Sequence, residues 1–306
     1  MVCKNNILGQ KKNYLRIDKT IINAINNKKV ITFPNAKINL GLNIISKRDD
    51  GYHNIETVFY PVKALYDVLE FVESKDKKTN IEMSGINIPM DTEDNIVMKA
   101  YRAFREKGIP PIEIRLRKNI PSGAGLGGGS SDGTFMLKLL NEKYKIFNEK
   151  ELISKSAELG SDCAFFAKNQ PVFASERGEN LSLSDVNLNG YKIAIVKSAD
   201  CVSTAQAYAN CTPKQPQKSI KEIIKEPIEN WRYELVNDFE ESVFVSHPNI
   251  KKVKDNIYES GAIYASMSGS GASVYGIYNK EESEDKIKKM LKEQMGDYFV
   301  FCGTLD

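Results

Sequence analysis

Pro121-Ser-Gly-Ala-Gly-Leu-Gly-Gly-Gly-Ser-Ser-Asp132 is the stretch that decides how this 306-residue chain is interpreted. Glycine at this density lets main-chain N–H groups approach a ligand closely, at a cost in stability. Apolar residues alternate before the run, from Ile112 to Leu116, and recur at helical spacing after it, from Phe135 to Tyr144. These patterns predict a strand, a glycine loop and a helix in succession.

Such a loop predicts a phosphate site, because the first amides of a helix and its dipole attract anions. A flexible connector is the alternative, although linkers seldom separate two strongly patterned elements. The G-x-x-x-x-G-K-[ST] motif is absent, and G-x-G-x-x-G at Gly123, Gly125 and Gly128 is a weak match in so glycine-dense a stretch. The flanking elements do not resemble repeated parallel βαβ units, which disfavours a nicotinamide site.

Residues 34–45 predict a second functional element. Apolar residues occupy every second position, so Lys37, Asn39 and Asn43 are expected on one face of a strand. An ordinary solvated face is the alternative. The chain is then expected to turn at Asp50-Gly51 and return as a strand over residues 55–62.

His53 follows this turn and is one of only two histidines in the chain. Two histidines are too few for a metal cluster, so His53 is either a surface loop residue or a ligand contact. Asp162 stands between a glycine and an apolar run, where it is either a helix N-cap or a carboxylate shielded from water. Residues 266–273 form a second glycine-serine loop, which alone would be a hairpin connection.

Together these segments resemble the GHMP kinase superfamily, which includes galactokinase and the homoserine, mevalonate and phosphomevalonate kinases. The resemblance covers the chain from about residue 34 to its end, and the Asp50-Gly-Tyr-His53 turn and the triple glycine are most similar to the 4-diphosphocytidyl-2-C-methyl-D-erythritol kinase family. The motifs are P-x-A-K-I-N-L at 34–40, D-G-Y-H at 50–53, the glycine run at 121–132, G-S-D at 160–162 and S-G-S-G-A at 268–272.

The resemblance implies a role for each matching residue. Lys37 matches the catalytic lysine and Asp162 the catalytic aspartate. The chain departs from many relatives where Cys163-Ala164 replace Val-Pro, which bears on the rigidity of that segment. ATP-binding residues are expected at Pro121, Ser122, Gly123, Ala124, Gly125, Leu126, Gly127, Gly128, Gly129, Ser130 and Ser131. Substrate-binding residues are expected at Asn39, Tyr52, His53, Thr204, Tyr208, Ser268, Gly269, Ser270 and Gly271.

Mixed strands and helices without a regular βαβα order predict an α+β fold. The resemblance implies a ribosomal-protein-S5-like domain followed by a ferredoxin-like domain. We therefore expect an N-terminal extension of unassigned role over residues 1–30, an ATP-binding domain over 31–188 and a substrate domain over 189–306. Further helices are expected over 91–107 and 281–295, and further strands over 191–197 and 298–302.

The composition restricts the class of protein. A hydrophobic fraction of 41% and a charged fraction of 27% are typical of a globular protein, and a net charge of +3 does not favour nucleic-acid binding. Five cysteines without a C-x-x-C pair predict neither a disulfide framework nor a zinc site. No apolar run is long enough to span a membrane, so we expect a cytoplasmic protein with no membrane partner.

The predicted activity is phosphoryl transfer from ATP to an alcohol, the 2-hydroxyl of a cytidine-diphosphate-linked methylerythritol by resemblance. Asp162 is expected to accept the hydroxyl proton, and Lys37 to keep Asp162 ionised and offset charge on the transferring group. Mg²⁺ is expected to arrive with the nucleotide, within reach of Ser130 or Ser131 and without a dedicated protein metal site. Two alternatives remain: a superfamily kinase for mevalonate or homoserine, and a nucleotide-binding sensor without activity.

Overall fold

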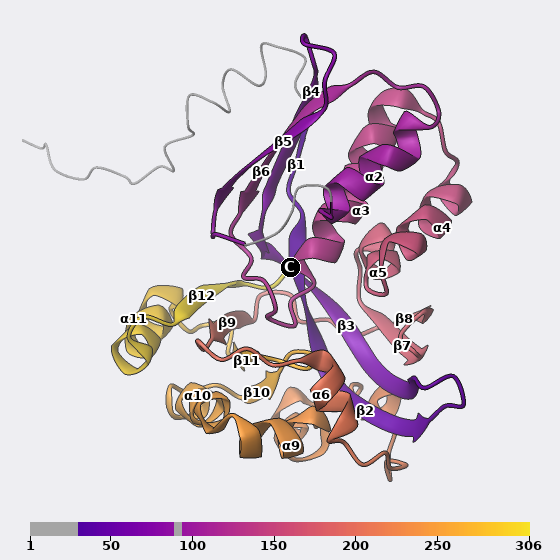
Figure 1. The fold of residues 1–306 in the computed structure, drawn as a ribbon. Helices are drawn as coiled ribbons and strands as arrows, with labels where there is room; N and C mark the ends of the chain where they lie inside the picture. The colour runs from indigo at the N-terminus through magenta and orange to yellow at the C-terminus, as the bar shows by residue number, and fades with distance from the viewer. Residues whose placement is uncertain (1–29, 89–93) are drawn as a thin grey trace, which may run out of the picture.

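The computed structural model describes residues 30–88 and 94–306 (Figure 1). The predicted N-terminal extension lies outside these residues, except for Val30, which begins a strand. Within the described ranges the strands form three four-stranded sheets, and helices and strands are mixed along the chain. The predicted α+β class is confirmed.

The N-terminal part holds two of these sheets. The first has the order β1-β4-β6-β5 and is covered by α2 and α3, and the second has the order β2-β3-β7-β8 (Figure 1). The elements are β1 (Val30–Thr32), β2 (Asn35–Lys47), β3 (His53–Tyr66), β4 (Val68–Glu73), β5 (Asn80–Gly85), α2 (Ile96–Arg105), β6 (Ile112–Lys118), α3 (Gly128–Tyr144), α4 (Glu149–Leu159), α5 (Cys163–Lys168), β7 (Val172–Glu176) and β8 (Asn180–Leu183).

The C-terminal part holds the third sheet, with the antiparallel order β10-β11-β9-β12. Counted from β9, this is the order 2-3-1-4 of a ferredoxin-like fold, with α10 and α11 packed on the sheet. The elements are β9 (Lys192–Lys197), α6 (Thr204–Ala209), α7 (Ile220–Ile223), the 3-10 helix η1 (Ile228–Asn230), α8 (Trp231–Glu234), α9 (Phe239–Ser246), α10 (Pro248–Glu259), β10 (Tyr264–Met267), β11 (Ser273–Tyr278), α11 (Glu284–Met295) and β12 (Phe299–Thr304).

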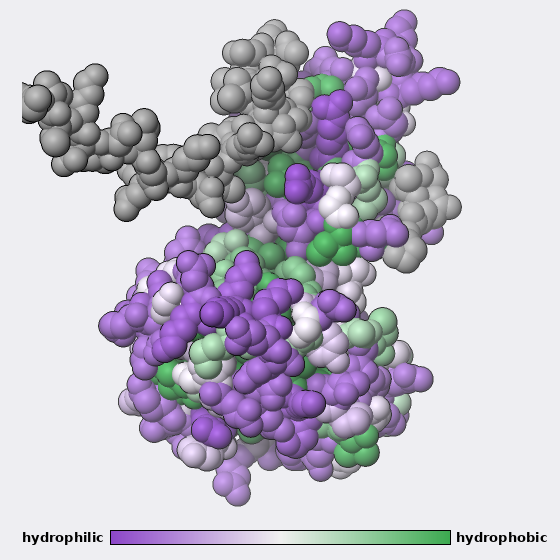
Figure 2. Space-filling model, turned by 90° about the vertical axis from the view of Figure 1, so that its left-hand side faces the viewer, coloured by the Kyte–Doolittle hydropathy of each residue, from purple (hydrophilic) through white to green (hydrophobic). Residues whose placement is uncertain are grey.

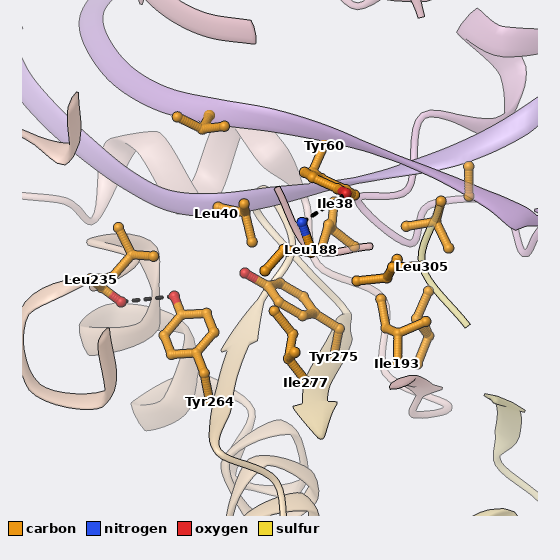
Figure 3. Packing of buried hydrophobic residues seen from close by; sticks show 14 of the residues in the cluster. Ile38, Leu40, Tyr60, Leu188, Ile193, Leu235, Tyr264, Tyr275, Ile277 and Leu305 are labelled. Atoms are coloured by element: carbon orange, nitrogen blue, oxygen red, sulfur yellow. Dashed lines mark hydrogen bonds between the residues drawn. The ribbon is translucent and has the colours of Figure 1, made fainter. Parts of the chain in front are cut away.

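One continuous apolar core joins the two parts. Side chains of the long β2–β3 hairpin pack against residues of β9, β10 and β11 (Figure 3). Two buried tyrosines use their hydroxyls within this core: Tyr60 accepts from the amide of Leu188 at 3.2 Å, and Tyr264 donates to the carbonyl of Leu235 at 2.8 Å. Buried polar groups with partners make the packing specific, and the Tyr60 bond joins the hairpin to the segment that leads into β9.

The register of the hairpin shifts at three places, and the one at Gly41 changes the predicted alternation beside Lys37 and Asn39. Leu40 pairs with Val58 and Leu42 pairs with Thr57, so Gly41 is an extra residue in β2, with φ +65°. A bulge of this kind uses the left-handed conformation that glycine adopts readily. It reverses the phase of the strand, so the prediction that Asn43 shares a face with Lys37 and Asn39 is wrong: Leu42 lines their cleft instead.

Most predicted elements are present with small shifts at their ends. The exception is the helix predicted from residue 91, where the first residues lie outside the described ranges. The helix begins at Ile96, because the side chain of Asn95 caps it by accepting from the amide of Val97. The first turn of α2 therefore contains no acidic residue.

The face drawn in Figure 2 is mostly hydrophilic over both parts, with hydrophobic residues scattered among the polar ones. Among the described helices, none combines the length and apolar character needed to cross a bilayer.

Candidate active site

The glycine loop connects β6 to the N-terminus of α3, as predicted. Gly127 is the N-cap of α3 and has φ +69°, where an added Cβ would come within 2.9 Å of the Phe166 ring. Glycine is required here both for the left-handed backbone and for the close approach. The amides that open this 17-residue helix therefore face the loop without a capping side chain.

The loop residues divide into an inward and an outward set. Pro121, Ala124, Leu126 and Ser131 are buried, whereas Ser122, Gly123 and Gly129 are exposed. The hydroxyl of Ser131 has no hydrogen-bond partner although it is fully buried. A cavity of about 310 Å³ beside the loop is lined by most of these residues and by the apolar side chains of Met83, Ile88, Ile96, Leu116 and Ile120.

A buried ion cluster lies at the end of β6, where the chain enters the glycine loop. Lys118, the last residue of β6, contacts the carboxylates of Asp67 and Asp132, and all three side chains are at most 3% exposed. Asp67 also accepts from the amides of Asn119 and Ile120, which lead into the loop. Burial raises the pKa of Asp132 well above its ordinary value against the attraction of Lys118.

Lys37 lies on β2 directly beside the glycine loop. Its amide donates to the carbonyl of Leu126 at 2.9 Å, and its ammonium donates to Asn39 Oδ1 at 2.6 Å. The ammonium also lies 3.4 Å from Asp162 Oδ2 and 4.9 Å from the centre of the Phe59 ring. The structure therefore brings the two predicted catalytic residues into contact.

Asp162 occupies the N-cap position of α5, but its side chain makes no capping hydrogen bond. Its carboxylate is 29% exposed, while its partner Lys37 is 4% exposed. Asp162 therefore holds the N-cap position without acting as a cap, and its carboxylate is only partly shielded from water, because it faces a cation and a cleft. The replacement of Val-Pro by Cys163-Ala164 leaves the helix intact, since both residues lie in its first turn.

The pair lies in a cleft of about 890 Å³ between the two parts of the chain. Gly123 and Gly125 line both this cleft and the cavity beside the loop, so the two spaces meet at the glycine loop. Residues of α4, of the turn after β7, of α6 and of the second glycine loop form the other walls, among them Ser154, Ala157, Arg177, Thr204, Tyr208, Gly269, Ser270 and Gly271.

The predicted aromatic residues occupy different places around the cleft. Tyr52 is 59% exposed and stacks under the guanidinium of Arg177, 5.1 Å from the ring centre. Tyr208 lines the cleft and stacks on His53, with ring centres 4.9 Å apart. Since that stack is closed, no base fits between His53 and Tyr208. Burial raises the pKa of Tyr208 to about 12, so its phenol is neutral at pH 7.

The second glycine loop is fixed to the first by side-chain hydrogen bonds. Ser268 is fully buried, and its hydroxyl donates to the carbonyl of Gly125 at 2.8 Å, so its side chain connects the loops instead of facing the cleft. Asn237 donates to the carbonyl of Gly269 at 2.8 Å. At the mouth, the hydroxyls of Thr204 and Ser270 lie 2.9 Å apart.

Lys118, Arg177 and Thr57 are among the residues at or behind the site that were not predicted from the sequence. Lys118 could have been found, because it falls on the apolar phase of β6 with Ile114 and Leu116, where a lone lysine needs a buried partner. Arg177 is exposed in a polar turn and carries no comparable signal. Thr57 is buried on β3, where a threonine is an ordinary strand residue.

Comparison with known proteins agrees with this geometry. Two family models match, GHMP kinases N terminal domain over residues 95–170 and GHMP kinases C terminal over residues 217–297. The 4-diphosphocytidyl-2-C-methyl-D-erythritol kinase of Bacteroides thetaiotaomicron is 54% identical over 256 residues, covering 82% of this chain and 93% of that relative. The same kinase of Parabacteroides distasonis is 49% identical over 280 residues, covering 90% and 100%.

Solved structures give the same result for the fold. A crystal structure of 4-(cytidine 5'-diphospho)-2C-methyl-D-erythritol kinase has a TM-score of 0.73 and 27% identity, and covers 90% of this chain and 98% of that one. A homoserine kinase from Cytophaga hutchinsonii has a TM-score of 0.65 over 90% and 95%, and at 19% identity it shares the fold alone. The chain belongs to the GHMP kinases, a group of small-molecule kinases, and within them to the 4-diphosphocytidyl-2-C-methyl-D-erythritol kinase family.

Proposed function

We propose that this chain phosphorylates the 2-hydroxyl of 4-diphosphocytidyl-2-C-methyl-D-erythritol with ATP, in the non-mevalonate isoprenoid pathway. The observation that carries the proposal is the contact of Lys37 with Asp162 at 3.4 Å, beside the glycine loop and at the junction of two cavities. The choice of acceptor rests on family membership. The two cavities that meet at this junction provide separate sites for ATP and for the acceptor.

ATP occupies the cavity beside the glycine loop in this proposal. The apolar side chains of Met83, Leu116 and Ile120 suit an adenine ring, and the exposed amides at Gly123 and Gly129 suit its phosphates. The buried residues Ala124 and Leu126 contribute backbone geometry, since their side chains belong to the core. This is the arrangement that phosphoryl transfer requires, where positioning and charge compensation dominate.

The transfer uses the Lys37–Asp162 pair. The oxygen of the acceptor hydroxyl bonds to the γ-phosphorus, and the bond between the γ-phosphorus and the β-phosphate oxygen breaks. Asp162 accepts the proton that the hydroxyl loses in this step. The Lys37 ammonium stabilises the ionised carboxylate and the charge on the transferring group. The 29% exposure of Asp162 leaves room for the hydroxyl, and the burial of Lys37 strengthens its field.

Mg²⁺ fits the same region through the nucleotide. The Ser131 hydroxyl is buried without a partner in the first turn of α3, and Ser130 lies beside it on the wall of the cavity. Hydroxyl and phosphate oxygens are ligands that Mg²⁺ prefers, and the ion supplies neutralisation of phosphate charge when bound. No dedicated protein metal site is proposed.

The acceptor occupies the larger cleft. Tyr208 offers an apolar face to the cytosine, and Arg177 beside Tyr52 offers a cation to the diphosphate. Thr204, Ser270 and Gly271 form the wall next to Tyr208. Residues 31–188 carry ATP and residues 189–306 most of the acceptor contacts, in a cytoplasmic protein that binds neither nucleic acid nor membranes.

The test is ATP-coupled turnover of the purified chain with four acceptors: 4-diphosphocytidyl-2-C-methyl-D-erythritol, mevalonate, homoserine and galactose. We expect turnover of the cytidyl substrate alone, and competition by cytidine diphosphate. Turnover of mevalonate or homoserine without competition by cytidine nucleotides would refute the substrate and leave the kinase chemistry standing. Binding of ATP with no turnover of any acceptor would favour a sensor.

A further inference from the structure

The place of the Lys37 ammonium depends on the orientation of one amide. Lys37 Nζ donates to Asn39 Oδ1 at 2.6 Å, and both side chains are almost completely buried. An asparagine amide has one accepting oxygen and one donating nitrogen, of similar size. Turned by 180°, Asn39 would place its NH₂ group against the ammonium, and the hydrogen bond would become a repulsive contact.

A threonine on the neighbouring strand determines that orientation. Asn39 Nδ2 donates to Thr57 Oγ1 at 3.0 Å, and Thr57 Oγ1 donates to the carbonyl of Gly41 at 2.6 Å. A hydroxyl can donate or accept, but a carbonyl oxygen can only accept. The single Thr57 proton is therefore committed to Gly41, and Thr57 Oγ1 can only accept from Asn39.

The carbonyl of Gly41 is available because of the bulge in β2. Gly41 is the extra residue between the pairs Leu40–Val58 and Leu42–Thr57, so its carbonyl is free to accept from a side chain. An added Cβ at position 41 would lie 2.7 Å from Leu235 Cδ1. Packing against the C-terminal part therefore keeps this residue a glycine and the bulge in place.

We infer that Thr57 is a positioning residue for phosphoryl transfer. Its hydroxyl donates to the Gly41 carbonyl and therefore accepts from the Asn39 amide. The amide oriented in this way holds the Lys37 ammonium next to Asp162. Thr57 is fully buried and does not line the cleft, so it acts through Asn39 and touches neither substrate. The inference rests on the proposed role of Lys37 in the transfer.

The test is Thr57→Val, which keeps the shape of the side chain and removes the hydroxyl. We expect kcat to fall by about tenfold or more, the effect of one lost hydrogen bond in the transition state, while the KM for ATP stays within about twofold. The acid limb of the kcat profile should move to higher pH, because a displaced Lys37 stabilises the Asp162 carboxylate less. Thr57→Ser, which restores the hydroxyl, should recover most of the activity and the profile.

Ser156→Ala is a matched control, since the buried Ser156 hydroxyl donates to the Leu152 carbonyl at 2.8 Å and does not line the cleft. It should leave both kcat and the pH profile of kcat unchanged. A Thr57→Val enzyme with wild-type kcat and profile overturns the inference, as does a Thr57→Ser enzyme equally impaired. The comparison uses any acceptor that the wild-type chain turns over, so an error in the proposed substrate is detected separately.

Discussion

Two buried lysines lie on either side of the glycine loop, and their surroundings differ. Lys118 is enclosed by the carboxylates of Asp67 and Asp132, which are as buried as the lysine itself. Lys37 contacts one carboxylate, Asp162, which is 29% exposed and lines a cleft. The buried cluster surrounds its cation with two carboxylates and fixes the backbone beside the loop, whereas the open pair leaves one side of its carboxylate for a reacting hydroxyl.

The cluster and the pair also differ in electrostatic balance. Burial opposes the charge on Lys118, but its two carboxylates outweigh that effect and raise its pKa. Lys118 therefore stays charged at neutral pH, held by both of its buried partners. Lys37 instead contacts an amide oxygen, a ring face and a single carboxylate, and that carboxylate is partly open to solvent.

The largest effect is expected for Lys118→Met. It leaves two buried carboxylates without a cation, and breaking a buried ion pair from one side costs about 3–5 kcal/mol. Urea unfolding should show this loss, or the variant should fail to fold. Lys37→Met is the matched variant: it should abolish most turnover with a much smaller loss of stability, because solvent reaches Asp162. Equal losses of stability would contradict the distinction between closed and open lysines.

Asp162→Asn should lower kcat on the order of 100-fold or more, because the variant has no base for the acceptor proton. The unfolding midpoint and the affinity for ATP should change little, since Asp162 makes no capping hydrogen bond. Single-turnover kinetics and calorimetry measure the two quantities. Near-wild-type turnover would mean that the carboxylate only neutralises Lys37.

Gly127→Val tests whether the glycine loop between the two lysines binds ATP. A β-branched residue at φ +69° is strained, and its Cβ would collide with Phe166 and approach Lys37 Cγ at 3.1 Å. We expect an ATP affinity at least about tenfold lower by calorimetry, which is 1.4 kcal/mol. Gly51→Ala, at a turn where an added Cβ meets no atom, controls for strain alone and should leave ATP affinity unchanged.

Much of this architecture follows from local sequence patterns. Alternation predicts β6 and the hairpin, and glycine density predicts the loop, because these features depend on neighbours in sequence. The bulge at Gly41 was not predicted, since a glycine on the polar phase of a strand looks like a regular position until Leu235 packs on it. The contacts of Lys118 with Asp67 and Asn39 with Thr57 join residues that no pattern relates, so they needed the fold.

Tyr208→Ala tests the acceptor side of the open pair. A stacked aromatic contributes roughly 1–3 kcal/mol per base, so the KM for the cytidyl substrate should rise about ten- to a hundredfold. The affinity for ATP should not change, since Tyr208 lines only the larger cleft. Tyr52→Ala should have the smaller effect, because Tyr52 is 59% exposed and already stacked on Arg177. A larger effect of Tyr52→Ala than of Tyr208→Ala would mean that the cytosine binds at the mouth of the cleft.

The smallest effect is expected from the pH dependence of His53. Partial burial, and then the nearby charge of Lys47, lower the pKa of His53 below 6.5, so the folded state favours the neutral ring that stacks on Tyr208. The stabilisation of the folded state by the neutral His53 ring is present above pH 6.5 and is lost as the pH falls through the lowered pKa of His53. Protonation then weakens the neutral His53–Tyr208 stack that supports the acceptor wall. The KM for the acceptor should therefore be flat from pH 7 to 8 and rise by less than about tenfold on acidification.

His53→Gln, which cannot titrate, should remove this rise while the acid limb of kcat stays. If the rise persists in the variant, another group near Tyr208 controls acceptor binding.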